Sequence, residues 1–167
     1  MTLKPALGYD KALILSHVFH RVARKHHLDP RMLVAIAYQE SAFNLSAIRK
    51  VSGFDMDRDR NYAEVTVGSD FCMMQINSAN IRHYGFDIER LLTDAEYCIT
   101  AGATILNGFK KRFGQLEEFW WTRYNACSTA HRELYRKLVD RHWGKILPPP
   151  ERTCSSEFAG DRFMDDL

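Results

Sequence analysis

Residues 29–43 read DPRMLVAIAYQESAF, and the helix that they predict is the starting point for the fold. Asp29 followed by Pro30 is typical of a helix start, because an aspartate caps free backbone N–H groups and proline fits the first helical position. The apolar residues that follow recur at helical spacing and form one stripe, made of Leu33, Ile36 and Ala37. We therefore predict an amphipathic helix from residue 30 to about residue 41.

Glu40 lies on the same stripe, four residues after Ile36 and seven after Leu33. Burial of a carboxylate costs several kcal/mol unless the group is paired or protonated. Glu40 is also at the C-terminal end of its helix, where the helix dipole disfavours a negative charge. Both effects predict a raised pKa for Glu40, as a general acid near neutral pH requires. The alternative is a surface glutamate that ends the helix and pairs with a nearby arginine.

Helical periodicity continues on both sides of this segment. It predicts a helix from Tyr9 to His26 that ends near Leu28, and others at 78–84, from a capping box at 93–96 to about 114, at 117–126 and at 129–143. Residues 47–70 are polar and contain glycine, with an alternating segment at 62–67. This pattern predicts a loop or a small hairpin lobe.

Length and composition favour one compact, mainly helical domain. The chain has 167 residues, 46% of them hydrophobic, and we place the domain at residues 1–147. Three prolines from position 148 begin a polar tail at 148–167. The net charge of +2 does not favour a nucleic-acid partner. No run of about 18 apolar residues predicts a membrane span, and no signal peptide is visible at the N-terminus.

Cysteine and acidic spacing predict neither a metal site nor a cofactor. The four cysteines lie far apart without a C-x-x-C pair, which argues against a zinc ribbon or a redox dithiol, although an even number permits disulfides. The acidic stretch at 55–60 fails the calcium-loop pattern, because its sixth position is Arg60 and its twelfth is Thr66. We therefore expect a solvated, charged lobe there.

Four segments in order resemble a known family. They are YQESAF at 38–43, DFCMMQINS at 70–78, ITAGATIL at 99–106 and RYNAC at 123–127. These resemble the Glu-Ser-x-Phe, Gly-Leu-Met-Gln-Ile-Asn, Asn-Ile-x-x-Gly-Ala-x-x-Leu and Ala-Tyr-Asn-Ala-Gly motifs of soluble lytic transglycosylases, in the goose-lysozyme-like superfamily. Asp70 and the Gln-Ile-Asn-Ser ending look most similar to the specialised transglycosylases of type III and type IV secretion and conjugation systems.

The resemblance implies a mainly α, lysozyme-like (α+β) fold, with a helical bundle around the catalytic glutamate and a small loop or β-hairpin lobe. It also implies cleavage of the MurNAc-β-1,4-GlcNAc bond of peptidoglycan without water. Glu40 would donate a proton to the leaving oxygen and then deprotonate the muramyl C6 hydroxyl, which closes a 1,6-anhydro ring. No cofactor takes part in this reaction.

The resemblance further assigns substrate-binding positions around Glu40. We expect substrate contacts from Ser41, Met73, Gln75, Tyr124 and Asn125. The amide of Gln75 both donates and accepts hydrogen bonds and would hold N-acetyl or hydroxyl groups. Tyr124 and Asn125 would orient Glu40. Met73 would pack beneath the groove together with Met74, the stronger core candidate of the two.

The chain departs from the family at several motif positions. Cys72 and Cys127 stand where the family has glycine, Cys98 where it has asparagine, and Arg123 where it has alanine. A cysteine in place of glycine implies either that the backbone there needs no positive φ or that the loop has shifted. Two alternatives stay open: a contact or bridge between Cys72 and Cys127, and buried thiols acting as small hydrophobes. Arg123 would contact peptidoglycan carboxylates or be solvated.

Two rivals share this fold. A hydrolytic muramidase needs a second carboxylate to activate water, with candidates Asp55, Asp57, Asp59, Glu64 and Asp70. An inactive peptidoglycan-binding assembly factor fits the substituted motifs, and a helical regulator or nucleic-acid protein is a more distant reading. The expected partner is the peptidoglycan glycan strand, together with components of a secretion, conjugation or phage entry machine. The substrate places the protein in the periplasm or cell envelope.

Overall fold

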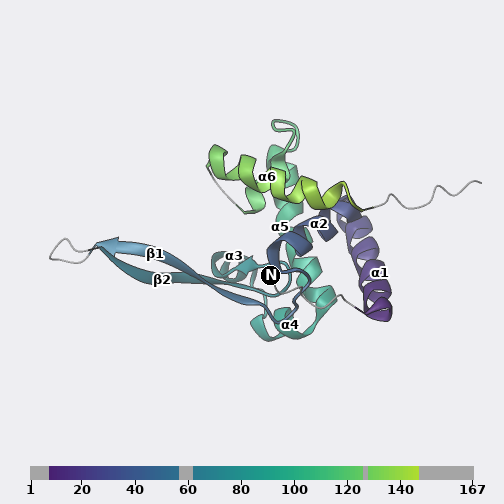
Figure 1. The fold of residues 1–167 in the computed structure, drawn as a ribbon, viewed down its shortest axis with the longest axis horizontal. Helices are drawn as coiled ribbons and strands as arrows, with labels where there is room; N and C mark the ends of the chain where they lie inside the picture. The colour runs from purple at the N-terminus through teal and green to yellow at the C-terminus, as the bar shows by residue number, and fades with distance from the viewer. Residues whose placement is uncertain (1–7, 57–61, 126–127, 147–167) are drawn as a thin grey trace, which may run out of the picture.

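The computed structural model describes residues 8–56, 62–125 and 128–146, which contain six α-helices and a three-stranded antiparallel sheet. The helices are α1 (Tyr9–His26), α2 (Pro30–Ser41), α3 (Ser78–Tyr84), α4 (Ile88–Thr93), α5 (Ala95–Phe113) and α6 (Thr129–Trp143). The strands are β1 (Ile48–Met56), β2 (Tyr62–Phe71) and β3 (Ile76–Asn77). In Figure 1 the helices pack against one another, and the β1–β2 hairpin extends away from them. The predicted mainly helical fold with a small hairpin lobe is confirmed.

Helix α2 forms as its sequence predicts. The Asp29 carboxylate accepts a hydrogen bond from the backbone N–H of Arg31 at 2.8 Å, and Pro30 occupies the first turn. The predicted stripe is fully buried and consists of Leu33, Ile36 and Ala37. Ala42 ends the helix with a left-handed φ of 52°, and its N–H donates to the Tyr38 carbonyl. Glu40 is thereby fixed in the last turn, next to the core.

Helix α5 is the centre of the fold and contacts α1, α4 and the 3-10 helix η1 (Trp120–Tyr124). Helix α2 packs between α1 and α6. Gly102 of α5 permits a close approach of Met74, because a Cβ at this position would lie 2.6 Å from Met74 Cε and 3.2 Å from its Cβ. The chain segment that contains Met74 is therefore held directly against the central helix.

The sheet brings three polar residues into one row. Strands β1, β2 and β3 are neighbours in that order, and Arg49 of β1 pairs directly with Asp70 of β2. Asp70 in turn pairs with Asn77 of β3. Directly opposed residues project from the same face of an antiparallel sheet. Arg49, Asp70 and Asn77 therefore lie side by side across all three strands.

The prediction for residues 93–96 is wrong in detail. Asp94, not Thr93, caps α5: its carboxylate accepts from the Tyr97 N–H at 3.0 Å. Thr93 is the last residue of α4, a short helix that periodicity did not reveal, and its hydroxyl donates to the Glu89 carbonyl. A six-residue helix is too short to show a 3.6-residue repeat.

The predicted α-helix at 117–126 is also wrong. Within the described residues this segment forms only η1, with backbone bonds over three residues such as Thr122 N–H to the Phe119 carbonyl at 3.0 Å. The Thr122 hydroxyl donates to the same carbonyl at 2.6 Å and so competes with an α-helical bond there. The tight turn buries Trp121 in the core.

Other boundaries agree with the sequence. Helices α1, α3 and α6 match their predicted ranges, and Ser128 caps α6 by accepting from the His131 N–H. The predicted tail at 148–167 and most of the acidic stretch at 55–60 lie outside the described residues. No helix in the described part of the chain has the length and apolar character needed to cross a membrane.

Candidate active site

Two adjoining hollows meet at Glu40. One, of about 490 Å³, lies on the α6 side and is lined by Gln39, Glu40, Arg49, Asn125, Ser128, His131, Leu134, Tyr135 and Leu138. The other, of about 590 Å³, lies over the sheet and is lined by Glu40, Arg49, Lys50, Asp70, Gln75, Asn77, Asn80, Phe109, Arg123, Tyr124 and Asn125. The residues common to both are Glu40, Arg49 and Asn125. The hollows therefore form a groove that extends to either side of Glu40.

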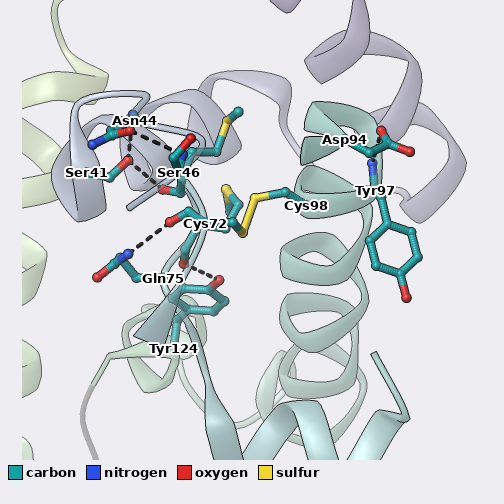
Figure 2. Close-up of a disulfide and its surroundings, with 11 residues drawn as sticks. Ser41, Asn44, Ser46, Cys72, Gln75, Asp94, Tyr97, Cys98 and Tyr124 are labelled. Atoms are coloured by element: carbon teal, nitrogen blue, oxygen red, sulfur yellow. Dashed lines mark hydrogen bonds between the residues drawn. A yellow bond between two sulfur atoms is a disulfide. The ribbon is translucent and has the colours of Figure 1, made fainter. Parts of the chain in front are cut away.

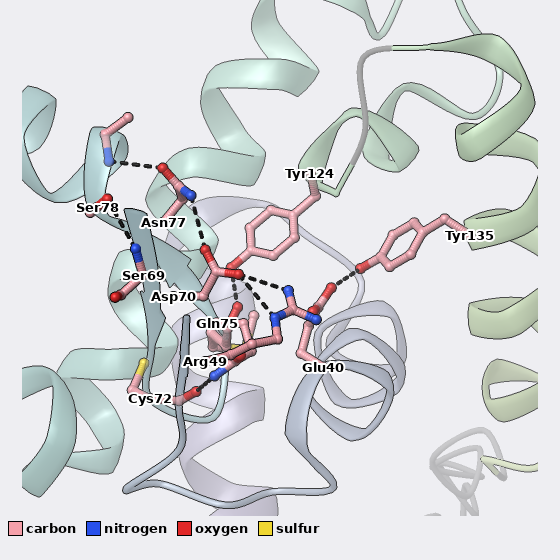
Figure 3. Close-up of polar contacts among 12 residues, drawn as sticks. Glu40, Arg49, Ser69, Asp70, Cys72, Gln75, Asn77, Ser78, Tyr124 and Tyr135 are labelled. Atoms are coloured by element: carbon pink, nitrogen blue, oxygen red, sulfur yellow. Dashed lines mark hydrogen bonds and ion pairs between the residues drawn. The ribbon is translucent and has the colours of Figure 1, made fainter. Parts of the chain in front are cut away.

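The Glu40 carboxylate is half-buried and held by the opposite wall. Tyr135 of α6 donates a 2.7 Å hydrogen bond to Glu40 Oε1 (Figure 3). Burial raises the pKa of Glu40, while the hydrogen bond from Tyr135, the charge of Arg49 and a hydrogen bond from Asn125 lower it less. The predicted rise of this pKa is confirmed, with burial as its main cause. The alternative of a surface glutamate is wrong.

Helix η1 places Tyr124 and Asn125 beside Glu40. The Tyr124 hydroxyl donates to the Met74 carbonyl at 2.8 Å, which anchors η1 to the segment before β3. Burial and the charges of Glu40 and Asp70 raise the pKa of Tyr124 well above its usual value. Tyr124 is therefore a neutral donor at any physiological pH. Asn125 lines both hollows and is placed to contact a bound chain on either side.

The tight turn between β2 and β3 carries Gln75. Cys72 and Gln75 both have left-handed φ values, 63° and 51°. The Gln75 side-chain amide donates to the Cys72 carbonyl at 2.9 Å, and this bond orients Gln75 along the second hollow. Ser41 and Met73, also predicted to bind substrate, line neither hollow. The Ser41 hydroxyl instead donates to the Met73 carbonyl at 3.0 Å, and Met73 is buried beneath the turn.

A disulfide joins this turn to the central helix. Cys72 pairs with Cys98 of α5, across a Cα–Cα distance of 6.3 Å (Figure 2). Cys72 and Cys98, which both depart from the family motifs, are thus the two halves of one disulfide. The expectation of buried thiols is wrong for Cys72 and Cys98, and a bridge from Cys72 to Cys127 is wrong because Cys72 is bonded to Cys98. A contact between Cys72 and Cys127 stays a prediction, since Cys127 lies outside the described residues. The idea that a cysteine at 72 implies no positive φ is also wrong, because Cys72 keeps the left-handed conformation.

The row of Arg49, Asp70 and Asn77 faces Glu40, and sequence reasoning named Asp70 as a candidate but missed its pairing with the other two. Arg49 Nη2 and Nε donate to Asp70 Oδ2 at 2.7 and 3.1 Å, and Asn77 Nδ2 donates to Asp70 Oδ1 at 2.9 Å (Figure 3). The Asp70 side chain is 7% exposed, and both of its oxygens accept hydrogen bonds from these two residues. Only the strand register pairs these residues. Arg49 lies outside the alternating segment at 62–67 that predicted a strand, so no sequence signal indicated its pairing with Asp70.

Tyr135 and Arg123 complete the walls of the groove. Tyr135 lies on the predicted helix at 129–143, four residues before buried Val139, and that spacing was the one signal that it faces inward. Arg123 is not simply solvated: its guanidinium is paired with Glu117 and lies 3.8 Å from the centre of the Phe113 ring. Its side chain borders the second hollow.

Among the five carboxylates considered for water activation, Asp70 is the one whose side chain the structure describes. Asp70 lines the second hollow, and its charge acts on Glu40. Asp55 and Glu64 lie in the hairpin strands, while positions 57 and 59 fall outside the described residues. Among the described side chains, Glu40 and Asp70 are thus the carboxylates that line the groove, and Asp70 is paired with the Arg49 guanidinium.

Comparison with known families agrees with this arrangement. The profile of the Transglycosylase SLT domain matches residues 17–140, more than half of the chain. The chain therefore belongs to the SLT transglycosylase family, and its helical body with a small three-stranded sheet is the lysozyme-like fold of that family. No curated protein and no solved structure gives a significant match.

Proposed function

We propose that this protein is a peptidoglycan lytic transglycosylase that cleaves the MurNAc-β-1,4-GlcNAc bond and leaves 1,6-anhydromuramyl ends. Membership of the SLT family supports the substrate and the reaction class. The observation that carries the proposal is the position of Glu40 at the junction of two hollows, with a pKa raised by burial. A long polymer can lie through such a groove with its scissile bond at Glu40.

In the proposed reaction one carboxyl group acts twice. Protonated Glu40 donates to the O4 atom of GlcNAc as the C1–O4 bond breaks. The resulting carboxylate then takes the proton of the muramyl C6 hydroxyl as its oxygen bonds to C1, so the protein ends in its starting protonation state. Tyr135 and Asn125 stabilise the transient carboxylate, because both donate hydrogen bonds to Glu40. Gln75 and Tyr124 border the sugar on the sheet side.

The decisive experiment compares digests of purified sacculi by the wild type and by Glu40→Gln, analysed by mass spectrometry. We expect 1,6-anhydromuropeptides from the wild type and their loss in the variant. Glu96→Gln is the matched control, because Glu96 undergoes the same chemical change on α5, where it pairs with Arg21 and lines neither hollow. Equal inertness of the wild type and Glu40→Gln with equal binding to sacculi would indicate an assembly factor instead.

We also propose that the protein acts in the cell envelope. Its substrate lies there, and the Cys72–Cys98 disulfide supports an oxidising compartment, because disulfides seldom persist in the bacterial cytosol. The resemblance of Asp70 and residues 75–78 to specialised transglycosylases supports a role together with a secretion, conjugation or phage entry machine. Fractionation of the producing cells and crosslinking from the intact protein test the location and the partners.

A further inference from the structure

The second carboxylate of the groove is unusually well restrained. Asp70 lines the same hollow as Glu40, and the two charges act on each other. In inverting glycosidases, a second carboxylate near the general acid activates the attacking water. Here both Asp70 oxygens accept hydrogen bonds, Oδ2 from the Arg49 guanidinium and Oδ1 from Asn77.

We propose that Arg49 is a positioning residue that determines the reaction product: its ion pair with Asp70 keeps that carboxylate from activating water, so the C6 hydroxyl is the nucleophile that completes the reaction. This inference rests on the proposed transglycosylase function. The inference goes beyond that function by naming the residue that keeps Asp70 from acting as a base.

The geometry of the sheet supports this role. Arg49 and Asp70 are directly opposed in the β1–β2 ladder, so the backbone places the guanidinium against the carboxylate. Arg49 lines both hollows, and Figure 3 shows its guanidinium between the side chains of Asp70 and Glu40. The Arg49 side chain is 54% exposed, whereas that of Asp70 is 7% exposed. A substitution at Arg49 therefore changes the groove surface with little change to the core.

The two competing reactions differ in the nucleophile and in the base that accepts its proton. In the first, the C1–O4 bond breaks as O4 takes the proton of Glu40, and the C6 oxygen then bonds to C1 while its proton goes to the Glu40 carboxylate. In the second, the oxygen of a water bonds to C1, one proton of that water goes to Asp70, and the C1–O4 bond breaks with O4 taking the proton of Glu40. Both Asp70 oxygens already accept hydrogen bonds, so a water must compete with the Arg49 guanidinium and with Asn77 before Asp70 can take its proton, which disfavours the second route.

Removal of the guanidinium also changes the titration of Glu40 in a predictable direction. The groups that act on Glu40 are Arg49 of β1 and Asp70 of β2, with neutral Tyr124 of η1, Asn125 and Tyr135 of α6. Loss of Arg49 removes a charge that lowers the pKa of Glu40 and exposes it to an unpaired Asp70, so both effects raise this pKa. The pH above which activity declines should move upward.

The test measures the ratio of reducing to 1,6-anhydro ends in digests of sacculi. For Arg49→Gln we expect this ratio to rise roughly tenfold or more, because a positioned general base accelerates its own step by about a hundredfold or more. Arg49→Gln/Asp70→Asn should return the ratio to the wild-type value, because the candidate base is gone. Arg49→Lys should give an intermediate ratio, since lysine keeps the positive charge but lacks the planar guanidinium that donates two hydrogen bonds to Asp70.

The controls separate the possible outcomes. Arg21→Gln breaks a comparable pair, with Glu96, on helices outside the groove and should leave the ratio unchanged. Circular dichroism checks folding, and Arg49→Met, which keeps the length of the side chain, replaces the glutamine variant if that variant does not fold. A slower variant that still yields only anhydro ends overturns the role of Arg49. Reducing ends from the wild type itself would instead overturn the proposed function.

Discussion

Tyr135 and Glu40, which are 95 residues apart in the sequence, are joined by a 2.7 Å hydrogen bond across the groove. Helix α6 packs against α2, and this contact places the phenol over the last turn of α2. Burial and the neighbouring Glu40 raise the pKa of Tyr135 well above its usual value, so it stays a donor. The bond therefore stabilises the carboxylate form of Glu40, the form that acts as the base.

Tyr135→Phe should lower the rate of peptidoglycan cleavage by roughly ten- to a hundredfold, because a hydrogen bond to a charged group contributes about 1.5–3 kcal/mol. The lost bond favoured the carboxylate, so the pKa of Glu40 rises further. The decline of activity at high pH should then shift upward. A pH profile of turbidity clearance measures both effects. Tyr97→Phe removes a hydroxyl outside the groove, which accepts from the Asp87 N–H, and should leave the profile in place.

Glu40→Gln should stabilise the protein near neutral pH. Burial raises the folded-state pKa of Glu40 above its ordinary value of 4.5, so wild-type stability falls as pH rises from about 4.5 through the folded pKa. Glutamine removes this penalty, and a gain of about 1 kcal/mol corresponds to a rise in Tm of roughly 2–4 °C. Melting curves should show this gain at pH 7 and its disappearance at pH 4. A gain of equal size at both values would contradict the assignment.

Reduction of the Cys72–Cys98 disulfide should destabilise the protein by about 3 kcal/mol. The bond closes a loop with a sequence separation of 26 residues, and this loop restricts the unfolded chain. Thermal melts with and without a phosphine reductant should differ by roughly 6–12 °C. The double variant Cys72→Gly/Cys98→Ala lacks the bond, and its Tm should not respond to the reductant.

The backbone at position 72 can be tested separately. Cys72 has a φ of 63°, which glycine adopts without strain and other residues adopt at a cost of about 1 kcal/mol or more. In a Cys98→Ala background, Cys72→Gly should therefore be more stable than Cys72→Ala by about 1 kcal/mol. Urea denaturation gives this difference directly. Equal stabilities would mean that the turn relaxes once the disulfide is absent.

Gly102→Ala should destabilise the protein by about 1–3 kcal/mol through overpacking against Met74. The new Cβ would lie 2.6 Å from Met74 Cε and 3.1 Å from its Cγ, in a fully buried region. Activity should also fall, because the Met74 carbonyl anchors Tyr124. Gly108→Ala is the control on the same helix. Its Cβ would lie 3.2 Å from the hydroxyl of exposed Tyr84, so stability should change by only about 0.5 kcal/mol.

Local sequence signals are enough to predict the framework of the site. Asp29, Pro30 and the apolar stripe of α2 fix a helix whose last turn holds Glu40, since the capping group and the 3.6-residue repeat act over neighbouring residues. The order of the four motifs likewise identified the fold. The same local signals failed at η1, where a side-chain hydrogen bond and the burial of Trp121 override helix propensity.

Which side chains surround Glu40 depends on contacts between distant parts of the chain. Strand register pairs Arg49 with Asp70, helix packing brings Tyr135 to Glu40, and the approach of the 72–75 turn to α5 joins Cys72 to Cys98. These contacts connect residues 21 to 95 positions apart. A periodic pattern shows which face of an element is buried, but the partner across that face depends on how the whole chain packs.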